Sequence, residues 1–273
     1  MTSPRVAAHR GGAGLWPENS LLAFRSAIGL GVALLELDVH LSTDDRLVVI
    51  HDRALTRTTN GTGFVDDLTA TALKQLRLRD RAGAVTGESV PLLDDVATLV
   101  APTRIGLLVE VKGPGPAVVY ERAGGRIRAM PGPRYEGLEA RAIEVLASAG
   151  VADRAMVMAF NPEVVRDVRR RAPEMATVLL LGVSHLALAQ ASPVEMLDLA
   201  DELGVTAVGL EHTLVDGALV SAARERGLGV NVWTVDDAAL MTRYAALGVD
   251  ILTTDRPDVG VEILGRAREE RTA

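Results

Sequence analysis

The strongest constraint on the fold of this chain is a repeated unit, in which a short apolar run is followed by a helical pattern. The expected strands are Val6–His9, Leu34–Val39, Ile105–Val111, Ala155–Phe160, Ala176–Leu181, Val205–Leu210, Gly229–Trp233 and Asp250–Thr253. The expected helices are Ser20–Gly31, Arg141–Ala149, Pro162–Arg171, Pro193–Leu203, Asp216–Arg226 and Asp237–Leu247. Short apolar, β-branched runs are typical of buried parallel strands. Eight such units in about 260 residues predict an α/β fold, a (β/α)₈ TIM barrel, with residues 1–273 forming a single domain.

One further strand-like run, Leu47–His51, does not fit this alternation. Only Leu41–Arg46 separates it from the preceding strand, whereas a parallel crossover needs about a dozen residues. We therefore expect an antiparallel β-hairpin that folds back and brings His51 close to Glu36 and Asp38.

Two long segments between strands show little periodicity. Residues of roughly 52–91 form a small insertion after the second strand, and Gly113–Pro133 is rich in glycine and proline. Insertions in a barrel usually lie over its catalytic face, so we expect both there, the second as a mobile loop.

Composition excludes several classes of function. The 273 residues carry a net charge of −7 and no cysteine. A nucleic-acid partner or an anionic membrane surface would require a basic patch, and thiolate chemistry or disulfides would require cysteine. The first residues contain no apolar run of the kind found in a secretory leader, so we expect none, and no 18-residue uncharged run follows. We expect a soluble cytoplasmic protein without membrane insertion, while the oligomeric state is left open.

Charged residues interrupt two of the apolar strands. Glu36 and Asp38 share one strand face, as do Glu110 and Lys112, and all fall at the C-terminal ends of their strands. Burying an unpaired carboxylate costs several kcal/mol, so three together imply a compensating cation. Oxygen ligands without cysteine favour Mg²⁺ or Ca²⁺ over Zn²⁺. The alternative is a set of ion pairs inside the barrel with Lys112 and Arg10.

Two histidines are expected beside these carboxylates. His9 follows the first strand and His51 follows the hairpin, and such a pair is a candidate for general acid–base catalysis. Three carboxylates, a divalent cation, Lys112 and Arg10 leave one positive charge, which a single phosphodiester would neutralise. The residues therefore favour an anionic substrate.

Eight short motifs occur in a fixed order along the chain. They are His9-Arg10-Gly11, Pro17-Glu18-Asn19-Ser20, Glu36-Leu37-Asp38-Val39, His51-Asp52, Val90-Pro91-Leu92, Glu110-Val111-Lys112, Trp233-Thr234-Val235 and Thr254-Asp255-Arg256-Pro257. In this order, over residues 6 to 257, the chain resembles the glycerophosphodiester phosphodiesterases.

The resemblance implies a TIM barrel that hydrolyses glycerophosphodiesters, small-molecule substrates, to an alcohol and sn-glycerol 3-phosphate. It implies a metal held by Glu36, Asp38 and Glu110, acid–base catalysis by His9 and His51, and phosphate contacts from Arg10 and Lys112. Headgroup preference, the choice between Mg²⁺ and Ca²⁺, the division of roles between the histidines, and attack by water or by a substrate hydroxyl all stay open.

Three further residues have two interpretations each. Asn19 is either a helix N-cap or a substrate-binding residue. Phe160 and Trp233 end barrel strands and either line the alcohol pocket, binding substrate, or pack in the core. We expect His40 to be a solvated residue of the hairpin.

Two other functions are compatible with the same motifs. A lysophospholipase D or a sphingomyelinase D-like enzyme would share the fold but would need an exposed apolar rim. A catalytically silent barrel that binds a phosphorylated ligand should lack one of the histidines or carboxylates, and all five are present.

Overall fold

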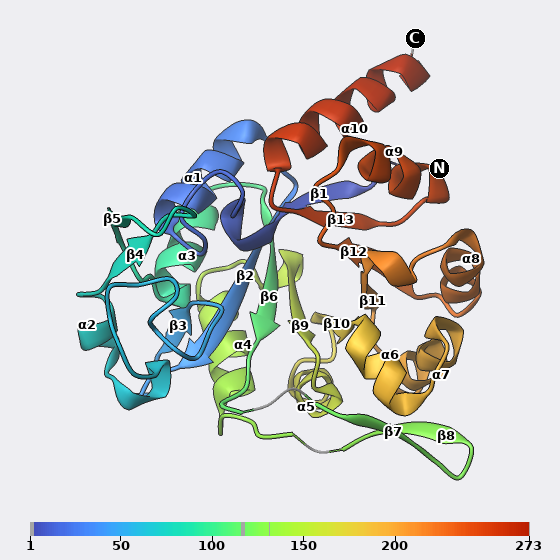
Figure 1. The fold of residues 1–273 in the computed structure, drawn as a ribbon, viewed down its shortest axis with the longest axis horizontal. Coiled ribbons are helices and arrows are strands. Elements are labelled where there is room, and N and C mark those ends of the chain that lie inside the picture. Colours follow the sequence, from blue (N-terminus) through green and yellow to red (C-terminus); the bar gives the residue numbers. More distant parts are fainter. Residues whose placement is uncertain (1–2, 116–117, 131, 273) are drawn as a thin grey trace.

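Eight parallel strands close into a barrel in the computed structural model, which describes residues 3–115, 118–130 and 132–272, with side chains up to residue 265 (Figure 1). The barrel strands are β1 (Arg5–Ala8), β2 (Leu34–Leu41), β6 (Gly106–Val111), β9 (Ala155–Ala159), β10 (Ala176–Leu181), β11 (Ala207–Glu211), β12 (Gly229–Trp233) and β13 (Ile251–Thr254). Strand β1 pairs with both β13 and β2, which closes the ring. The predicted (β/α)₈ barrel is confirmed.

Helices surround the ring and connect successive strands. They are α1 (Leu21–Leu30), α3 (Leu93–Val100), α4 (Leu138–Ser148), α5 (Pro162–Arg171), α6 (Val183–Ala189), α7 (Pro193–Leu203), α8 (Gly217–Glu225), α9 (Ala238–Leu247) and α10 (Pro257–Thr272). Short 3₁₀ turns are His9–Gly11, Val65–Asp67, Ala152–Arg154 and His212–Leu214. The ends of α7 show why the expected bounds hold: Ser192 caps its first turn, and Gly204 ends it at a φ of 64°.

Two apolar layers hold the barrel together. The interior is filled by a small cluster: Ala7, Leu34, Leu108, Met158, Val178, Leu180, Ala207 and Ile251. A much larger cluster lies between the strands and the surrounding helices. The interior cluster fills the barrel below the C-terminal strand ends, and the polar residues of the cavity described below lie above it, at those ends. Among the described residues, no helix combines the length and the apolar character needed to cross a bilayer.

The expected hairpin is confirmed. Strand β3 (Leu47–Val49) runs antiparallel to β2, with Leu47 opposite Leu41. The backbone N–H of Ile50 donates to the carbonyl of Asp38 over 3.0 Å. This hydrogen bond returns the chain to the level of Asp38, and the next residue is His51.

The chain after His51 forms a compact excursion that lies beside β3 and α3, at the left of Figure 1. It contains α2 (Ala70–Leu73) and the antiparallel strands β4 (Arg77–Arg79) and β5 (Val85–Ser89). The excursion shares a small core with the hairpin, formed by Val48, Ile50, Leu55, Val65, Ala70, Leu73, Leu78, Val90 and Leu92. The excursion and the hairpin are therefore packed as one unit.

Part of the Gly113–Pro133 segment, predicted as a mobile loop, has regular secondary structure. Strands β7 (Tyr120–Ala123) and β8 (Arg126–Ala129) form a hairpin, seen beyond α6 and α7 at the lower right of Figure 1. Its turn is Gly124–Gly125, and both glycines have positive φ, as a tight turn between two strands requires. Residues 116, 117 and 131 of this segment lie outside the described residues.

The prediction for His40 is also wrong, because its side chain is only 2% exposed. The ring Nε2 lies 3.0 Å from the carbonyl oxygen of His51, which only accepts, so Nε2 carries the proton. The other ring nitrogen, Nδ1, then accepts from the hydroxyl of Tyr135 over 3.0 Å. A polar residue at the edge of a hairpin is thus covered by a segment nearly a hundred residues away.

His40 should make stability depend on pH. Burial lowers the pKa of His40 to about 4 from its ordinary value of 6.5. The unfolded chain therefore takes up this proton first, and stability is lost as the pH falls through 6.5 toward 4. Between about pH 7.5 and pH 5, the free energy of unfolding of the wild type should fall by about 2 kcal/mol more than that of His40→Gln. Urea unfolding at both pH values measures this difference, and equal losses would contradict the prediction.

Candidate active site

The polar residues expected from the sequence converge at the C-terminal ends of the barrel strands. His9 directly follows β1, Glu36 and Asp38 lie on β2, and Glu110 lies on β6. A cavity of about 140 Å³ opens among them. Its lining residues are His9, Arg10, Glu36, His51, Glu110, Lys112, Met158, Phe160, Leu180, Asn231, Trp233, Thr234 and Thr253.

Three carboxylates form the polar centre of this cavity. Glu36, Asp38 and Glu110 are 1%, 0% and 8% exposed, and one oxygen from each lies within 4.8 Å of the others. Within the described part of the chain, the buried Oε1 of Glu36 has no hydrogen-bond partner. Hard oxygen donors with a free buried lone pair fit a divalent cation, so the cluster could hold Mg²⁺ or Ca²⁺.

The same carboxylates also form the ion pairs considered as an alternative. The Nζ of Lys112 lies 2.9 Å from Oδ1 of Asp38 and also contacts Glu110. The Nε of Arg10 lies 3.4 Å from Oδ2 of Asp38. Two cations against three carboxylates leave one negative charge uncompensated, so these ion pairs do not neutralise the cluster.

The protonation states of the cluster reflect this imbalance. Burial, together with the neighbouring charge of Asp38, raises the pKa of Glu36 to about 8. Burial alone would also raise the pKa of Asp38, but Lys112 and Arg10 hold it well below its usual range. Without a further cation, Glu36 is therefore the carboxyl that takes up a proton near neutral pH.

Each histidine is oriented by a carboxylate. The Nδ1 of His9 lies 2.6 Å from Oδ1 of Asp255, and the Nδ1 of His51 lies 2.6 Å from Oδ1 of Asp52. Ionised carboxylates only accept, so Nδ1 donates in both pairs and Nε2 is left to face other groups. The sequence analysis gave Asp52 and Asp255 no role, although both stand inside the motifs that carried the resemblance.

The two imidazoles have opposite electrostatic environments. Burial would lower the pKa of His9, but the hydrogen bond to Asp255 and the charge of Glu36 raise it above its ordinary value. Burial lowers the pKa of His51, and Lys112 and Arg10 lower it further. The two rings therefore bind protons with different affinity although their hydrogen-bonding partners are alike.

Asn19 is not the N-cap of α1, and its side chain contacts the acidic cluster instead. Ser20 is the N-cap of α1, since its hydroxyl accepts from the N–H of Ala23 over 3.0 Å. The amide Nδ2 of Asn19 donates to Oδ2 of Asp38 over 2.8 Å. Asn19 therefore positions Asp38 from a residue whose φ is 58°.

A salt-bridge network that the sequence analysis missed ties the excursion to the barrel. Arg57 contacts Glu18 over 2.7 Å and also pairs with Asp52, the partner of His51. Glu18 in turn accepts from Arg10 over 3.0 Å. No sequence signal marked Arg57, because it is one of many arginines in a segment without periodicity.

Phe160 and Trp233 both line the cavity. Their rings meet edge to face, with centroids 5.7 Å apart. His185, to which the sequence gave no role, stacks on Phe160 with centroids 5.0 Å apart. The aromatic rings thus form an apolar wall whose orientation is fixed by packing.

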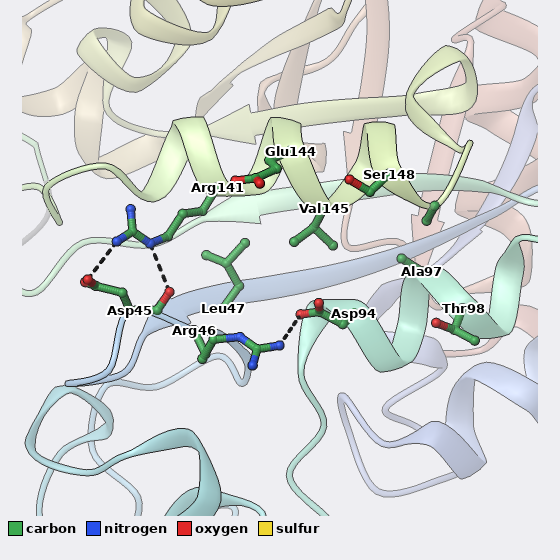
Figure 2. A pocket seen from close by; sticks show the side chains of 11 residues that line it. Asp45, Arg46, Leu47, Asp94, Ala97, Thr98, Arg141, Glu144, Val145 and Ser148 are labelled. Atoms are coloured by element: carbon green, nitrogen blue, oxygen red, sulfur yellow. Dashed lines mark hydrogen bonds and ion pairs between the residues drawn. The ribbon is translucent and has the colours of Figure 1, made fainter.

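A second hollow lies outside the ring between β3, α3 and α4 (Figure 2). Arg141 and Asp45 pair over 2.7 Å, and Arg46 and Asp94 pair over 3.2 Å, as Figure 2 shows. These charges satisfy one another across the surface and do not converge on a common point. The candidate active site is therefore the cavity at the strand ends.

Comparison with known proteins gives the family. Residues 9–259 match the model of the glycerophosphoryl diester phosphodiesterase family. A glycerophosphodiester phosphodiesterase of Caldanaerobacter subterraneus is 31% identical over 95% of this chain and 97% of its own length. A glycerophosphodiester phosphodiesterase of Bacillus altitudinis is also 31% identical, over 95% of this chain and 97% of its own length.

Solved structures agree on the fold. A glycerophosphodiester phosphodiesterase of Agrobacterium tumefaciens superimposes with a TM-score of 0.73 at 26% identity, over 96% of this chain and 100% of its own. A phosphodiesterase of Oleispira antarctica, in complex with the product sn-glycerol-3-phosphate, has a TM-score of 0.76 at 24% identity, over 96% and 97%. The chain therefore belongs to the glycerophosphoryl diester phosphodiesterase family and is a phosphoric diester hydrolase.

Proposed function

We propose that the chain hydrolyses glycerophosphodiesters to an alcohol and sn-glycerol 3-phosphate, with a divalent cation at Glu36, Asp38 and Glu110 and acid–base catalysis by His9 and His51. The observation that carries the proposal is the convergence of two carboxylate-oriented histidines on one buried acidic cluster. The Oleispira antarctica phosphodiesterase, solved with sn-glycerol-3-phosphate, supports the substrate class.

The acidic cluster would hold the cation through three carboxylates, each on a barrel strand. When bound, such a cation polarises the phosphoryl group and offsets the negative charge that develops on it. Asn19 would keep Asp38 in place. Lys112 and Arg10, which both pair with Asp38, would also contact the substrate phosphate.

The histidines would move the protons. The Nε2 of one imidazole takes the proton of the attacking hydroxyl, from water or from the substrate's own glycerol arm. The oxygen activated in this way forms a bond to phosphorus, the bond from phosphorus to the alcohol oxygen breaks, and the other ring, an imidazolium, gives its Nε2 proton to that leaving oxygen. Attack by the glycerol hydroxyl would give a cyclic phosphate, which water then opens to sn-glycerol 3-phosphate. Asp255 and Asp52 hold each ring in the tautomer that the transfer needs.

The second candidate function is cleavage of a larger lipid phosphodiester. One observation favours it: Val119 and Met130, which flank the β7–β8 hairpin, are 44% and 47% exposed. Assays with glycerophosphocholine and lysophosphatidylcholine side by side separate the two candidates. Turnover of glycerophosphocholine alone supports the first, and preference for lysophosphatidylcholine supports the second. Binding of phosphorylated ligands without turnover of either would indicate a silent barrel.

Removal of the cation should abolish activity. We expect EDTA to stop hydrolysis of glycerophosphocholine and Mg²⁺ or Ca²⁺ to restore it. Glu110→Gln should weaken cation binding at least about tenfold, since it removes one charged ligand. Calorimetric titration of the EDTA-treated protein measures this directly. The control is Glu144→Gln, on the outer hollow, which should bind as the wild type does. Activity that is indifferent to EDTA would contradict the proposed cation.

Loss of either histidine should show which one is the acid. His9→Ala and His51→Ala should each lower kcat on glycerophosphocholine by roughly 10²–10⁴-fold. A p-nitrophenyl leaving group departs without a proton, so it should rescue only the variant that lacks the general acid. Steady-state kinetics on both substrates test this. Near wild-type turnover of glycerophosphocholine by either variant would refute the pairing.

Replacing Lys112 by arginine should not preserve activity. Its side chain is 14% exposed, and its Nζ lies between Asp38 and Glu110. A planar guanidinium is wider and needs a bidentate partner, so Lys112→Arg should lower kcat/KM at least about tenfold. The other lysine of the chain, Lys74, pairs with Asp95 at the surface over 2.8 Å, so Lys74→Arg is the matched control. Equal efficiency of both arginine variants would show that positive charge alone suffices.

A further inference from the structure

A buried amide without partners lies on the wall opposite the acidic cluster. Asn231 of β12 is 3% exposed and lines the cavity. Neither its Oδ1 nor its Nδ2 has a hydrogen-bond partner among the described residues. Two residues further along the same strand, the buried Nε1 of Trp233 is also unpaired. Trp233 belongs to one of the eight sequence motifs, whereas Asn231 belongs to none.

The topology of the barrel sets what this amide faces. Strand β12 is four strands from β6 in either direction around the ring, so the two strands lie on opposite sides of the cavity. In register, Asn231 stands between Gly209 and Ile251, which have no polar side chains. At Gly209, even a Cβ atom would come within 2.5 Å of Leu180. The neighbouring strands therefore offer this amide no side-chain partner, and a hydrogen-bond partner has to be a molecule bound in the cavity.

The wall around Asn231 is uncharged and partly apolar. The cavity residues on the strands from β9 to β13 are Met158, Leu180, Asn231, Trp233 and Thr253. The cavity of about 140 Å³ exceeds roughly tenfold the space that one water needs. An amide with one acceptor and two donors, beside aromatic and aliphatic side chains, suits a small neutral polyol: hydroxyls pair with the amide and C–H groups contact the rings.

We infer that Asn231 is the specificity-determining residue that recognises the hydroxyl groups of the substrate's glycerol arm. The inference rests on the proposed function, which places the phosphate at the acidic cluster and so directs one arm of the diester across the cavity. A quaternary ammonium headgroup in the same place has neither donor nor acceptor and would leave the amide unpaired. The chemistry of this wall therefore assigns it to the polyol arm.

The stability of an Asn231 variant distinguishes a role in substrate recognition from a role in packing. A buried polar group without partners destabilises the folded protein, and an apolar group of the same shape removes that cost. Asn231→Leu should therefore unfold at the same urea concentration as the wild type or at a higher one, while losing recognition of the hydroxyls. If Asn231 served packing instead, Asn231→Leu would unfold at a lower urea concentration and would keep its recognition of the hydroxyls.

Binding of two phosphate monoesters tests the inference without turnover. sn-Glycerol 3-phosphate and propyl phosphate have the same charge and differ in their hydroxyls. In a magnesium-containing buffer, calorimetric titration should show the wild type binding the glycerol ester about 10- to 100-fold more tightly. Asn231→Leu should reduce this ratio to about threefold or less. Thr177→Val is the matched control, because Thr177 is a buried barrel residue with an unpaired hydroxyl that does not line the cavity.

Three outcomes would overturn the inference. They are equal affinity of the wild type for the two esters, an unchanged ratio in Asn231→Leu, and an equal loss of the ratio in Thr177→Val. Since the measurement is of binding, failure to hydrolyse glycerophosphodiesters would overturn the proposed function and leave this result standing. If Asn231→Leu does not fold, the wild-type ratio and the ratio for Asn231→Ser decide the matter in the same way.

Discussion

The structure depends on the burial of three carboxylates at the mouth of an apolar barrel. Glu36, Asp38 and Glu110 lie in surroundings where an uncompensated negative charge is strongly unfavourable. Lys112 and Arg10 offset part of that charge and leave the remainder. A barrel interior filled with aliphatic side chains thus carries a localised excess of negative charge at one end, which favours a cation there and raises the pKa of Glu36.

A further set of polar groups keeps this arrangement rigid. Asn19 holds Asp38, and Asp255 and Asp52 hold the histidines. Such partners fix ring orientation and tautomer, which the reactive groups cannot do for themselves. They come from loops that follow different strands, so closing the ring assembles them. This is the reason that the C-terminal face of a barrel supports chemistry while its opposite face supports stability.

Sequence periodicity was enough to predict the ring, since buried parallel strands are apolar on both faces and stand out against amphipathic helices. The β2–β3 hairpin followed from chain length alone. The burial of His40 could not be predicted from the sequence, because Tyr135, which covers it, lies far along the chain. The β7–β8 hairpin could not be predicted either, because it is polar and its turn is made of glycines.

Within the site, a charged residue inside an apolar strand is conspicuous in the sequence. The carboxylates and Lys112 were therefore predicted from the sequence. Asn231 was not found, because a single amide between two valines resembles any strand residue until the closed ring shows that no described residue pairs with it. Asp255 and Arg57 contact residues that are distant in the sequence, and local sequence patterns do not predict such contacts.

The hairpin that presents His51 has a consequence for how the site opens. His9 follows a strand that pairs with a neighbouring barrel strand on each side. His51 follows β3, which pairs with β2 on one side, makes an isolated bridge to Leu92 on the other, and shares the separate small core of the excursion. Cooperative units of this kind open at a lower free energy than the ring to which they attach. The two histidines therefore belong to parts of the molecule with different opening equilibria. Backbone amides around His51 should exchange with solvent deuterium through a partial opening that leaves those of β1 protected.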